Sequence, residues 1–165
     1  MVEGVVDDGA VIVLTPVEAA MAGAVGSIRH GLSVKDGRRD RHGLKADDDG
    51  LSHHILGAAG ELAVAKLLGR YWGGDVNSFK RPDVGNLQVR TRSKHEWDLI
   101  IREDDNPADA FVHVTGSPTR LIVHGWIRGR DGMLDEFRQN HGGRPPAWFV
   151  PRRVLRPMVK RSLAA

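Results

Sequence analysis

The stretch Pro82–Arg90, with the sequence PDVGNLQVR, decides how the middle of this chain folds. Runs of alternating polarity flank its central Gly-Asn pair, and glycine in the first position of a two-residue turn is typical of a type II′ β-hairpin. This turn places Asp83 opposite Gln88, with their Cβ atoms roughly 4.5–5.5 Å apart on one face. Arg81 then opposes Arg90, and the two like charges repel each other unless an anion lies between them. The stretch therefore predicts a hairpin that holds a metal and phosphate site.

The composition fits one globular domain of 165 residues with a sizeable core. Its 24 lysines and arginines only slightly exceed its 21 acids, and the formal net charge is +3. Most of these cations are arginines, whose planar guanidinium groups bind phosphate or carboxylate groups through paired hydrogen bonds. The bias favours recognition of such anions, although a GC-rich genome would produce the same bias.

Several classes of protein are excluded by what the sequence lacks. The absence of cysteine rules out disulfides, thiolate zinc sites and cysteine nucleophiles. No apolar run approaches the roughly 18 residues of a membrane span, and the N-terminus lacks the segments of a secretory signal. Neither a phosphate-cradling GxxxxGK[ST] loop nor a nucleophile elbow occurs. We therefore expect a soluble, cytoplasmic protein with no membrane partner.

Two helices are predicted in the first half of the chain. Thr15–Glu18 forms a capping box with proline in the first helical position, apolar residues at helical spacing follow, and Gly31 is a plausible end. A second helix, from about residue 53 to 68, is apolar on almost every side and rich in small residues that let another backbone approach closely. Residues 35–50 between them are mostly charged residues, glycine and histidine, which predicts a mobile charged loop.

The rest of the chain reads mainly as strands. They are predicted at Val11–Leu14 (a strand or an ordered lead-in), in both arms of a hairpin over residues 76–93, and at Asp98–Arg102, Phe111–Thr115 and Leu121–Ile127. Residues 152–165 form a basic tail, with a short helix predicted over Val154–Leu163. Helices followed by several strands indicate an α/β (α+β) fold, with residues 1–165 as a single domain.

Glu61 is the only acid inside the second predicted helix, and Gly57, Ala58, Ala65 and Leu68 share its face. Carboxylates are almost never fully buried without a partner. Glu61 therefore either reaches solvent at a groove or binds something positive, which includes a salt bridge to an arginine as well as a metal ion.

Asp83 and Gln88 are the other candidate oxygen donors. Magnesium needs only one or two carboxylates, together with water and substrate phosphate. Glu61 and Asp83 supply two carboxylates, and Gln88 supplies a neutral carbonyl oxygen. The alternatives remain that Asp83 is a turn residue beside Gly85 and that Gln88 is an exposed strand residue.

The run from Leu87 to Lys94 alternates strictly in polarity. Its apolar positions face the core, which leaves Gln88, Arg90, Arg92 and Lys94 in one polar row. Three cations with no acid between them favour phosphate contact over a simple solvated face. Away from this row, His113 and His124 lie on adjacent predicted strands, where packing with a local hydrogen bond is a simpler interpretation than metal binding.

These residues resemble the PD-(D/E)xK nucleases, the restriction-endonuclease-like superfamily, which carry a helical acid, a Pro-Asp pair, and an acid-x-lysine tripeptide after a short hairpin. Glu61 matches the helical acid, Pro82-Asp83 matches the first half of the motif, and Gln88-Val89-Arg90 occupies the second half. Residues 57–151 also look like small phage-type proteins. Two positions depart from the pattern, since Gln88 replaces the usual acid and Arg90 the usual lysine.

The resemblance implies a restriction-endonuclease-like core, a mixed central sheet of about five strands flanked by helices, and cleavage of phosphodiester bonds with Mg²⁺ or Mn²⁺. Glu61, Asp83 and Gln88 would hold the metal, and Arg90 would stabilise negative charge on the phosphate. Lys94 or Lys80 would substitute for the missing lysine. Arg81, Arg90, Arg92, Lys94 and Lys80 would contact the nucleic acid, expected to be DNA.

Two further functions stay open. Because both departures weaken catalysis but leave the basic row intact, the chain is alternatively a weak or inactive nucleic-acid-binding protein on the same fold. A structural or protein-interaction role is the third candidate. A homodimer is also considered, and a phage origin would place the protein in the cytoplasm of a bacterial host.

Overall fold

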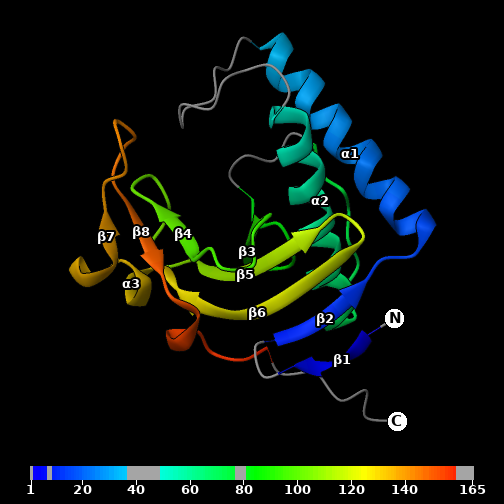
Figure 1. The fold of residues 1–165 in the computed structure, drawn as a ribbon. Coiled ribbons are helices and arrows are strands. Elements are labelled where there is room, and N and C mark those ends of the chain that lie inside the picture. The colour runs from blue at the N-terminus through cyan, green and yellow to red at the C-terminus, as the bar shows by residue number, and fades with distance from the viewer. Residues whose placement is uncertain (1, 7–8, 37–48, 77–80, 159–165) are drawn as a thin grey trace.

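The computed structural model describes residues 2–6, 9–36, 49–76 and 81–158, and Figure 1 shows two β-sheets with two long helices stacked over one of them. The elements are β1 (Val2–Val6), β2 (Gly9–Val13), α1 (Pro16–Lys35), α2 (Asp49–Leu68), β3 (Leu87–Arg92), β4 (Leu99–Arg102), β5 (Ala110–Ser117), β6 (Arg120–Arg128), α3 (Gly129–Gly132), β7 (Arg138–Gln139) and β8 (Ala147–Val150), with short 3₁₀ turns η1 (Asp135–Phe137) and η2 (Arg152–Val154). The mixed α/β class expected from the sequence is confirmed. Lys80 and most of the charged segment 35–50 lie outside the described residues.

The predicted start of α1 is confirmed in atomic detail. Thr15 Oγ1 accepts a hydrogen bond from the Glu18 amide, and Glu18 Oε2 accepts one from the Thr15 amide at 2.7 Å. The predicted end at Gly31 is wrong, because α1 continues to Lys35 and closes with the Asp36 amide bonded to the Leu32 carbonyl. A single exposed glycine lowers helix stability by only about 1 kcal/mol, which neighbouring turns offset.

The small residues of α2 let it pack tightly on both sides. A Cβ at Gly60 would clash with the Oγ1 atom of Thr91 on β3, and a Cβ at Gly26 of α1 would lie 2.5 Å from the Ile55 Cα. Glycine at these two positions therefore sets how closely α2 approaches the sheet and α1. The same packing buries Ala58, Ala59, Ala63 and Val64 completely.

The larger sheet is mixed, with the strand order β1-β2-β6-β5-β3. β3 runs parallel to β5, whereas the other neighbours are antiparallel. β4, which we expected in this central sheet, instead pairs with β8 in a second sheet of order β4-β8-β7. The expectation of helices flanking the sheet is met on one face only, where α2 packs on the sheet and α1 packs on α2 (Figure 1).

The two-residue turn predicted at Gly85-Asn86 forms, and the strand pairing predicted beyond it is wrong. Within the described residues the antiparallel pairing is limited to one bridge between Val84 and Leu87, with Gly85 at a φ of +61° as the expected turn requires. Extending the ladder would need a backbone N–H from Pro82, which proline lacks. The Val89 amide instead donates to the Asp83 carboxylate at 2.6 Å, so Asp83 does not oppose Gln88 and Arg81 does not oppose Arg90.

Two apolar cores lie on opposite faces of β3 and β5. On the helix face, Val89 and Val112 pack with α2, while on the second-sheet face Phe111 packs with Leu99 and Ile101 of β4. The described part of the tail also differs from its prediction. It forms an extended bridge between Arg156 and Trp126 in place of a helix, because both backbone hydrogen bonds of that pair are made. Among the described helices, none combines the length and apolar character needed to cross a membrane.

Candidate functional site

Glu61 lies on the buried side of α2 and is 7% exposed. Arg29 of α1 binds both of its carboxylate oxygens, with Nη1–Oε1 and Nη2–Oε2 distances of 2.7 and 2.9 Å. Trp72 Nε1 donates to Oε2 at 3.1 Å. Burial lowers the pKa of Arg29, but its hydrogen bonds to Glu61 and the charge of that carboxylate outweigh burial and raise it. Of the outcomes open at the sequence level, a salt bridge to arginine is therefore the one observed.

Asp83 lies just before β3, at the edge of the larger sheet. Its Oδ2 atom accepts the Val89 N–H, which points away from the neighbouring strand β5. Burial, and after it the negative charge of Glu61, raise the pKa of Asp83 to about 6. The Val89 N–H and the charges of Arg90 and Arg29 act in the opposite direction. Asp83 and Glu61 are thus close electrostatic neighbours.

Gln88 and Arg90 point to the second-sheet face, away from α2. Gln88 Nε2 donates to Asp109 Oδ2 at 3.1 Å, and Arg90 Nη2 contacts Asp105 Oδ1 at 2.7 Å. The Arg90 guanidinium also lies over the Phe111 ring. The charges of Glu61 and Arg90 both act on the pKa of Asp83, whereas Gln88 lies on the opposite face from Glu61.

The donor set for a divalent cation is consequently smaller than the sequence predicted. Within the part of the chain that the structure describes, no group of three or more histidines and acids could hold a metal ion. Asp83 and Glu61 remain a pair of carboxylates, which is the number that Mg²⁺ commonly takes from a protein. Glu61 could contribute only by sharing an oxygen with Arg29. Glu61 and Asp83 therefore remain the candidate cation ligands, and Gln88 does not join them.

The basic row on β3 divides into two halves. Arg90 is neutralised by Asp105, whereas Arg92 donates to the Asp98 backbone carbonyl at 3.1 Å and lies over the Trp97 ring. Lys94 lies over the same ring. Burial, followed by the charges of Arg102 and Arg144, lowers the pKa of Arg92 to about 10. Arg81 is exposed in the turn before Asp83, away from this row.

Sequence reasoning missed Arg29, Trp72, Asp105 and Asp109, which hold the candidate residues in place. One signal for Arg29 was present, because it is the single lysine or arginine of α1 before its last turn and Glu61 is the single acid in the body of α2. Lone opposite charges on two apolar helices favour each other. The aspartates of the turn after β4 gave no comparable signal, because their contacts depend on how the two sheets pack.

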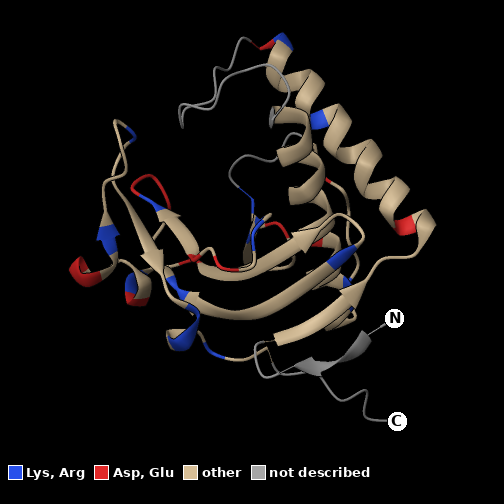
Figure 2. Ribbon diagram, viewed as in Figure 1, with Lys and Arg blue, Asp and Glu red and all other residues tan. Residues whose placement is uncertain are grey.

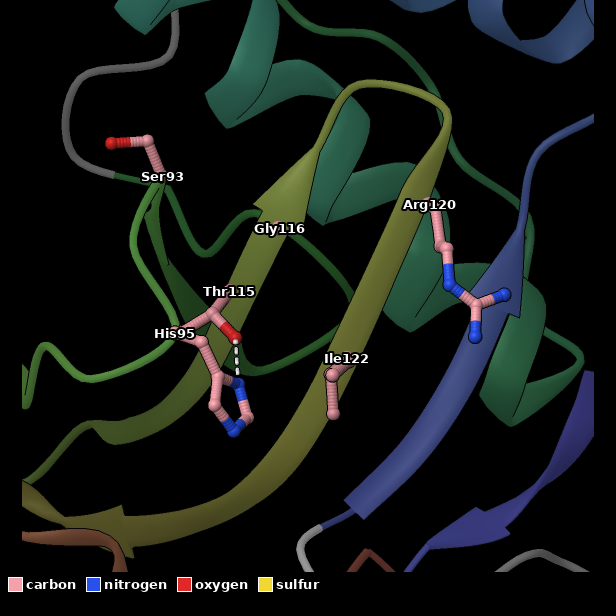
Figure 3. Close-up of a pocket in the computed structure, with 6 residues that line it drawn as sticks. All are labelled: Ser93, His95, Thr115, Gly116, Arg120 and Ile122. Atoms are coloured by element: carbon pink, nitrogen blue, oxygen red, sulfur yellow. Dashed lines mark hydrogen bonds between the residues drawn. The ribbon is translucent and has the colours of Figure 1, made fainter.

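His95 and Thr115, which share a hydrogen bond, line an open pocket of about 250 Å³ next to the end of β3 (Figure 3) and belong to a longer chain of hydrogen bonds. Arg152 Nη1 lies 2.9 Å from His95 Nε2, His95 Nδ1 lies 3.3 Å from Thr115 Oγ1, and this hydroxyl lies 2.7 Å from His124 Nε2. Because a guanidinium only donates, Nε2 of His95 accepts and its Nδ1 carries the proton. The direction is thereby fixed from Arg152 through His95 to Thr115, whose hydroxyl can either donate to or accept from His124. Ser93 joins this pocket to the polar row.

His113 behaves as the simpler interpretation predicted. Its ring stacks on His124 with centroids 5.0 Å apart, and its Nε2 atom lies 3.0 Å from the Trp97 carbonyl. Burial, followed by the charge of His124, lowers the pKa of His113 to about 3. It is therefore a neutral core histidine, and packing with a local hydrogen bond is confirmed.

The pKa of Asp83, at the sheet edge, is thus affected by the charge of Glu61 on α2 and by the charges of Arg90 and Arg29. Comparisons with protein-family models, with curated proteins and with solved structures find no match to this chain. A function is therefore inferred from these side chains themselves.

Proposed function

We propose that this chain is a metal-dependent nuclease that hydrolyses phosphodiester bonds of nucleic acid, with DNA as the expected substrate. The observation that carries the proposal is the coupling of Asp83 to Glu61 at the edge of β3. Two partly or fully buried carboxylates that repel each other are both stabilised by a divalent cation, and strongly shifted pKa values concentrate at functional sites. The resemblance of Glu61 and Pro82-Asp83 to the PD-(D/E)xK pattern, with its implied restriction-endonuclease-like core, supports the same function.

In this proposal Asp83 and Glu61 hold Mg²⁺ or Mn²⁺, and Gln88 is left out of the ligand set. The cation would polarise the scissile phosphate and lower the pKa of a bound water. Arg90, whose charge already acts on Asp83, offers a permanent positive charge to a phosphate. Arg29 fixes the position of Glu61 and balances its charge until a cation shares that carboxylate.

A second candidate is a nucleic-acid-binding protein that does not cleave. It is favoured by one observation, which is that Arg29 already satisfies both oxygens of Glu61. A cation then has to compete with Arg29 for the carboxylate of Glu61. If the cation does not bind, the protein keeps its basic row but has no catalytic metal.

The test is cleavage of supercoiled, linear and branched DNA, and of RNA, with Mg²⁺ or Mn²⁺. We expect the wild type to cut at least one substrate, and Asp83→Asn and Glu61→Gln to lose that activity. Asp104→Asn, which changes an exposed acid in the turn after β4, serves as the control and should cut normally. If no substrate is cut but DNA binds in EDTA with affinity that falls steeply as salt rises, the second candidate replaces the first.

A further inference from the structure

The polar side chains of β3 are neutralised at one end of the strand and not at the other. Gln88 and Arg90 are each held by an aspartate. Arg92 and Lys94 form no ion pair with any described residue and instead lie over Trp97, at 4.7 and 5.0 Å from the ring centroid. Trp97 itself is 38% exposed. Positive charge is therefore concentrated beyond Arg90, away from Asp83.

Two arginines from the second sheet add to this charge. Arg102 ends β4 and pairs in register with Ala147 of β8, and Arg144 lies three residues before Ala147 in the β7–β8 connection. The Arg102 amide donates to Asp105, the same aspartate that holds Arg90, so the end of β4 lies beside the row on β3. Figure 2 shows basic residues at the end of β4 and at the tip of the β7–β8 connection.

The charges of these arginines act on one another. Arg102 and Arg144 both lower the pKa of Arg92, after the effect of burial, and Asp98 is the acid that acts against them. Guanidinium groups repel each other, and an anion bound between them offsets the repulsion.

The spacing of the cations favours an extended anion over a small one. They come from three separate segments, and side chains on one face of a strand recur about every 6.6 Å, twice the rise per residue. Arg90 and Arg92 are therefore one such interval apart, with Lys94 and the second-sheet arginines beyond them. A single phosphate ion would meet only part of this set.

We propose that Arg92, Lys94, Arg102 and Arg144, which we call the arginine cluster, bind the sugar-phosphate backbone of the nucleic acid beyond the position cleaved at Asp83. This inference rests on the proposed function and adds to it the path of the substrate, which runs from the edge of β3 across to the second sheet. The bound strand therefore extends from the Asp83 end of the polar row toward the β7–β8 connection.

The experiment measures binding of a fluorescently labelled 20-nucleotide single strand and a 20-base-pair duplex in EDTA, over a range of salt concentrations. Arg144→Gln and Arg102→Gln should each weaken binding several-fold and reduce the slope of log affinity against log salt by about 1. Arg130→Gln, which removes an exposed arginine on α3 outside the cluster, is the matched control and should leave the slope unchanged. Circular dichroism and urea unfolding confirm that each variant is folded.

Two results would overturn the inference. One is an unchanged affinity and slope for both cluster variants, or no binding by the wild type. The other is displacement of the nucleic acid by low millimolar inorganic phosphate with a change in Trp97 fluorescence, which would assign the cluster to the free ion. The outcomes also separate the two proposals. If Arg144→Gln still cleaves and binds as the wild type does, the nuclease proposal stands and the binding role of the arginine cluster is rejected. If binding depends on the cluster but no substrate is cleaved, the binding role stands and the nuclease proposal is rejected.

Discussion

The guanidinium group of Arg29 holds both carboxylate oxygens of Glu61, and through them it joins α1 to α2 beneath the sheet edge that carries Asp83. Arg29 also donates two hydrogen bonds to the Asp75 carbonyl, at 2.8 and 2.6 Å. One side chain therefore fixes a helix, a buried acid and the segment that leads toward β3. Its partner Glu61 is the acid whose charge raises the pKa of Asp83.

Removing Arg29 should destabilise the protein strongly, because Glu61 would be left buried without its charge partner. For Arg29→Met we expect a loss of about 3–5 kcal/mol in the free energy of unfolding, measured by urea titration at pH 7. The double variant Arg29→Met/Glu61→Leu should recover most of this loss, because both charges leave together. A single variant that loses less than about 1 kcal/mol would show that solvent or another cation stabilises Glu61.

Asp83 should make stability depend on pH in a defined direction. Its pKa in the folded protein, about 6, lies above the ordinary value of 3.8, so the fold disfavours the ionised form. Asp83→Asn should therefore be as stable as the wild type below pH 4 and more stable above pH 6, by up to about 3 kcal/mol. Asparagine retains an oxygen that can accept the Val89 N–H, so the backbone contact survives.

The same pair of proteins provides a test of cation binding by thermal unfolding at pH 7.5. Saturating Mg²⁺ or Mn²⁺ should raise the melting temperature of the wild type and leave that of Asp83→Asn unchanged. An equal rise in both proteins would locate the cation elsewhere. Asp104→Asn, with its exposed side chain, should behave as the wild type throughout.

Gly60 should tolerate no side chain. A Cβ at this position would clash with Thr91 Oγ1, so Gly60→Ala is expected to lower the free energy of unfolding by about 1–3 kcal/mol. A Cβ at Gly57, one turn earlier in α2, would meet nothing within 4 Å, and Gly57→Ala should be neutral or stabilise by up to about 1 kcal/mol. Chemical denaturation of the two variants side by side separates close packing from helix propensity.

Restoring an acid at position 88 should not by itself improve the site. Gln88→Glu would place a carboxylate against Asp109, which now accepts a hydrogen bond from the Gln88 amide. We expect a loss of about 1 kcal/mol in stability at pH 7 and its recovery in Gln88→Glu/Asp109→Asn. Unfolding titrations measure both changes, and a stable single variant would show that the two acids do not face each other.

Local features of the chain were predictable and long-range pairings were not. The capping box over Thr15–Glu18 fixes the start of α1 through atoms only three residues apart. The strands predicted at Phe111–Thr115 and Leu121–Ile127 lie within β5 and β6, and alternation identified the polar face of β3. The same alternation carries no information about which strand lies beside β3. The turn at Gly85 forms as predicted, yet Pro82 lacks the N–H that a longer hairpin needs on the outer edge of β3. The parallel pairing of β3 with β5 uses its other edge.

The site follows the same division. An arginine partner for Glu61 was one of the two outcomes that its burial in an apolar helix allowed, because a buried acid requires a positive neighbour. The positions of Asp105 and Asp109 could not be predicted from the sequence. These aspartates face Arg90 and Gln88 because β4 belongs to the second sheet and not to the central one. The prediction that Gln88 converges with Asp83 was wrong because it required the longer hairpin, which does not form.

The hydrogen bond from Val89 to Asp83 also protects the protein from unwanted assembly. An outer strand normally offers unpaired amides on which another chain can grow the sheet. Here the Asp83 carboxylate accepts the hydrogen bond of the Val89 amide. A strand that paired at this edge would have to displace Asp83, on which the proposed chemistry depends. Strand addition at this edge and the proposed chemistry would therefore compete for Asp83.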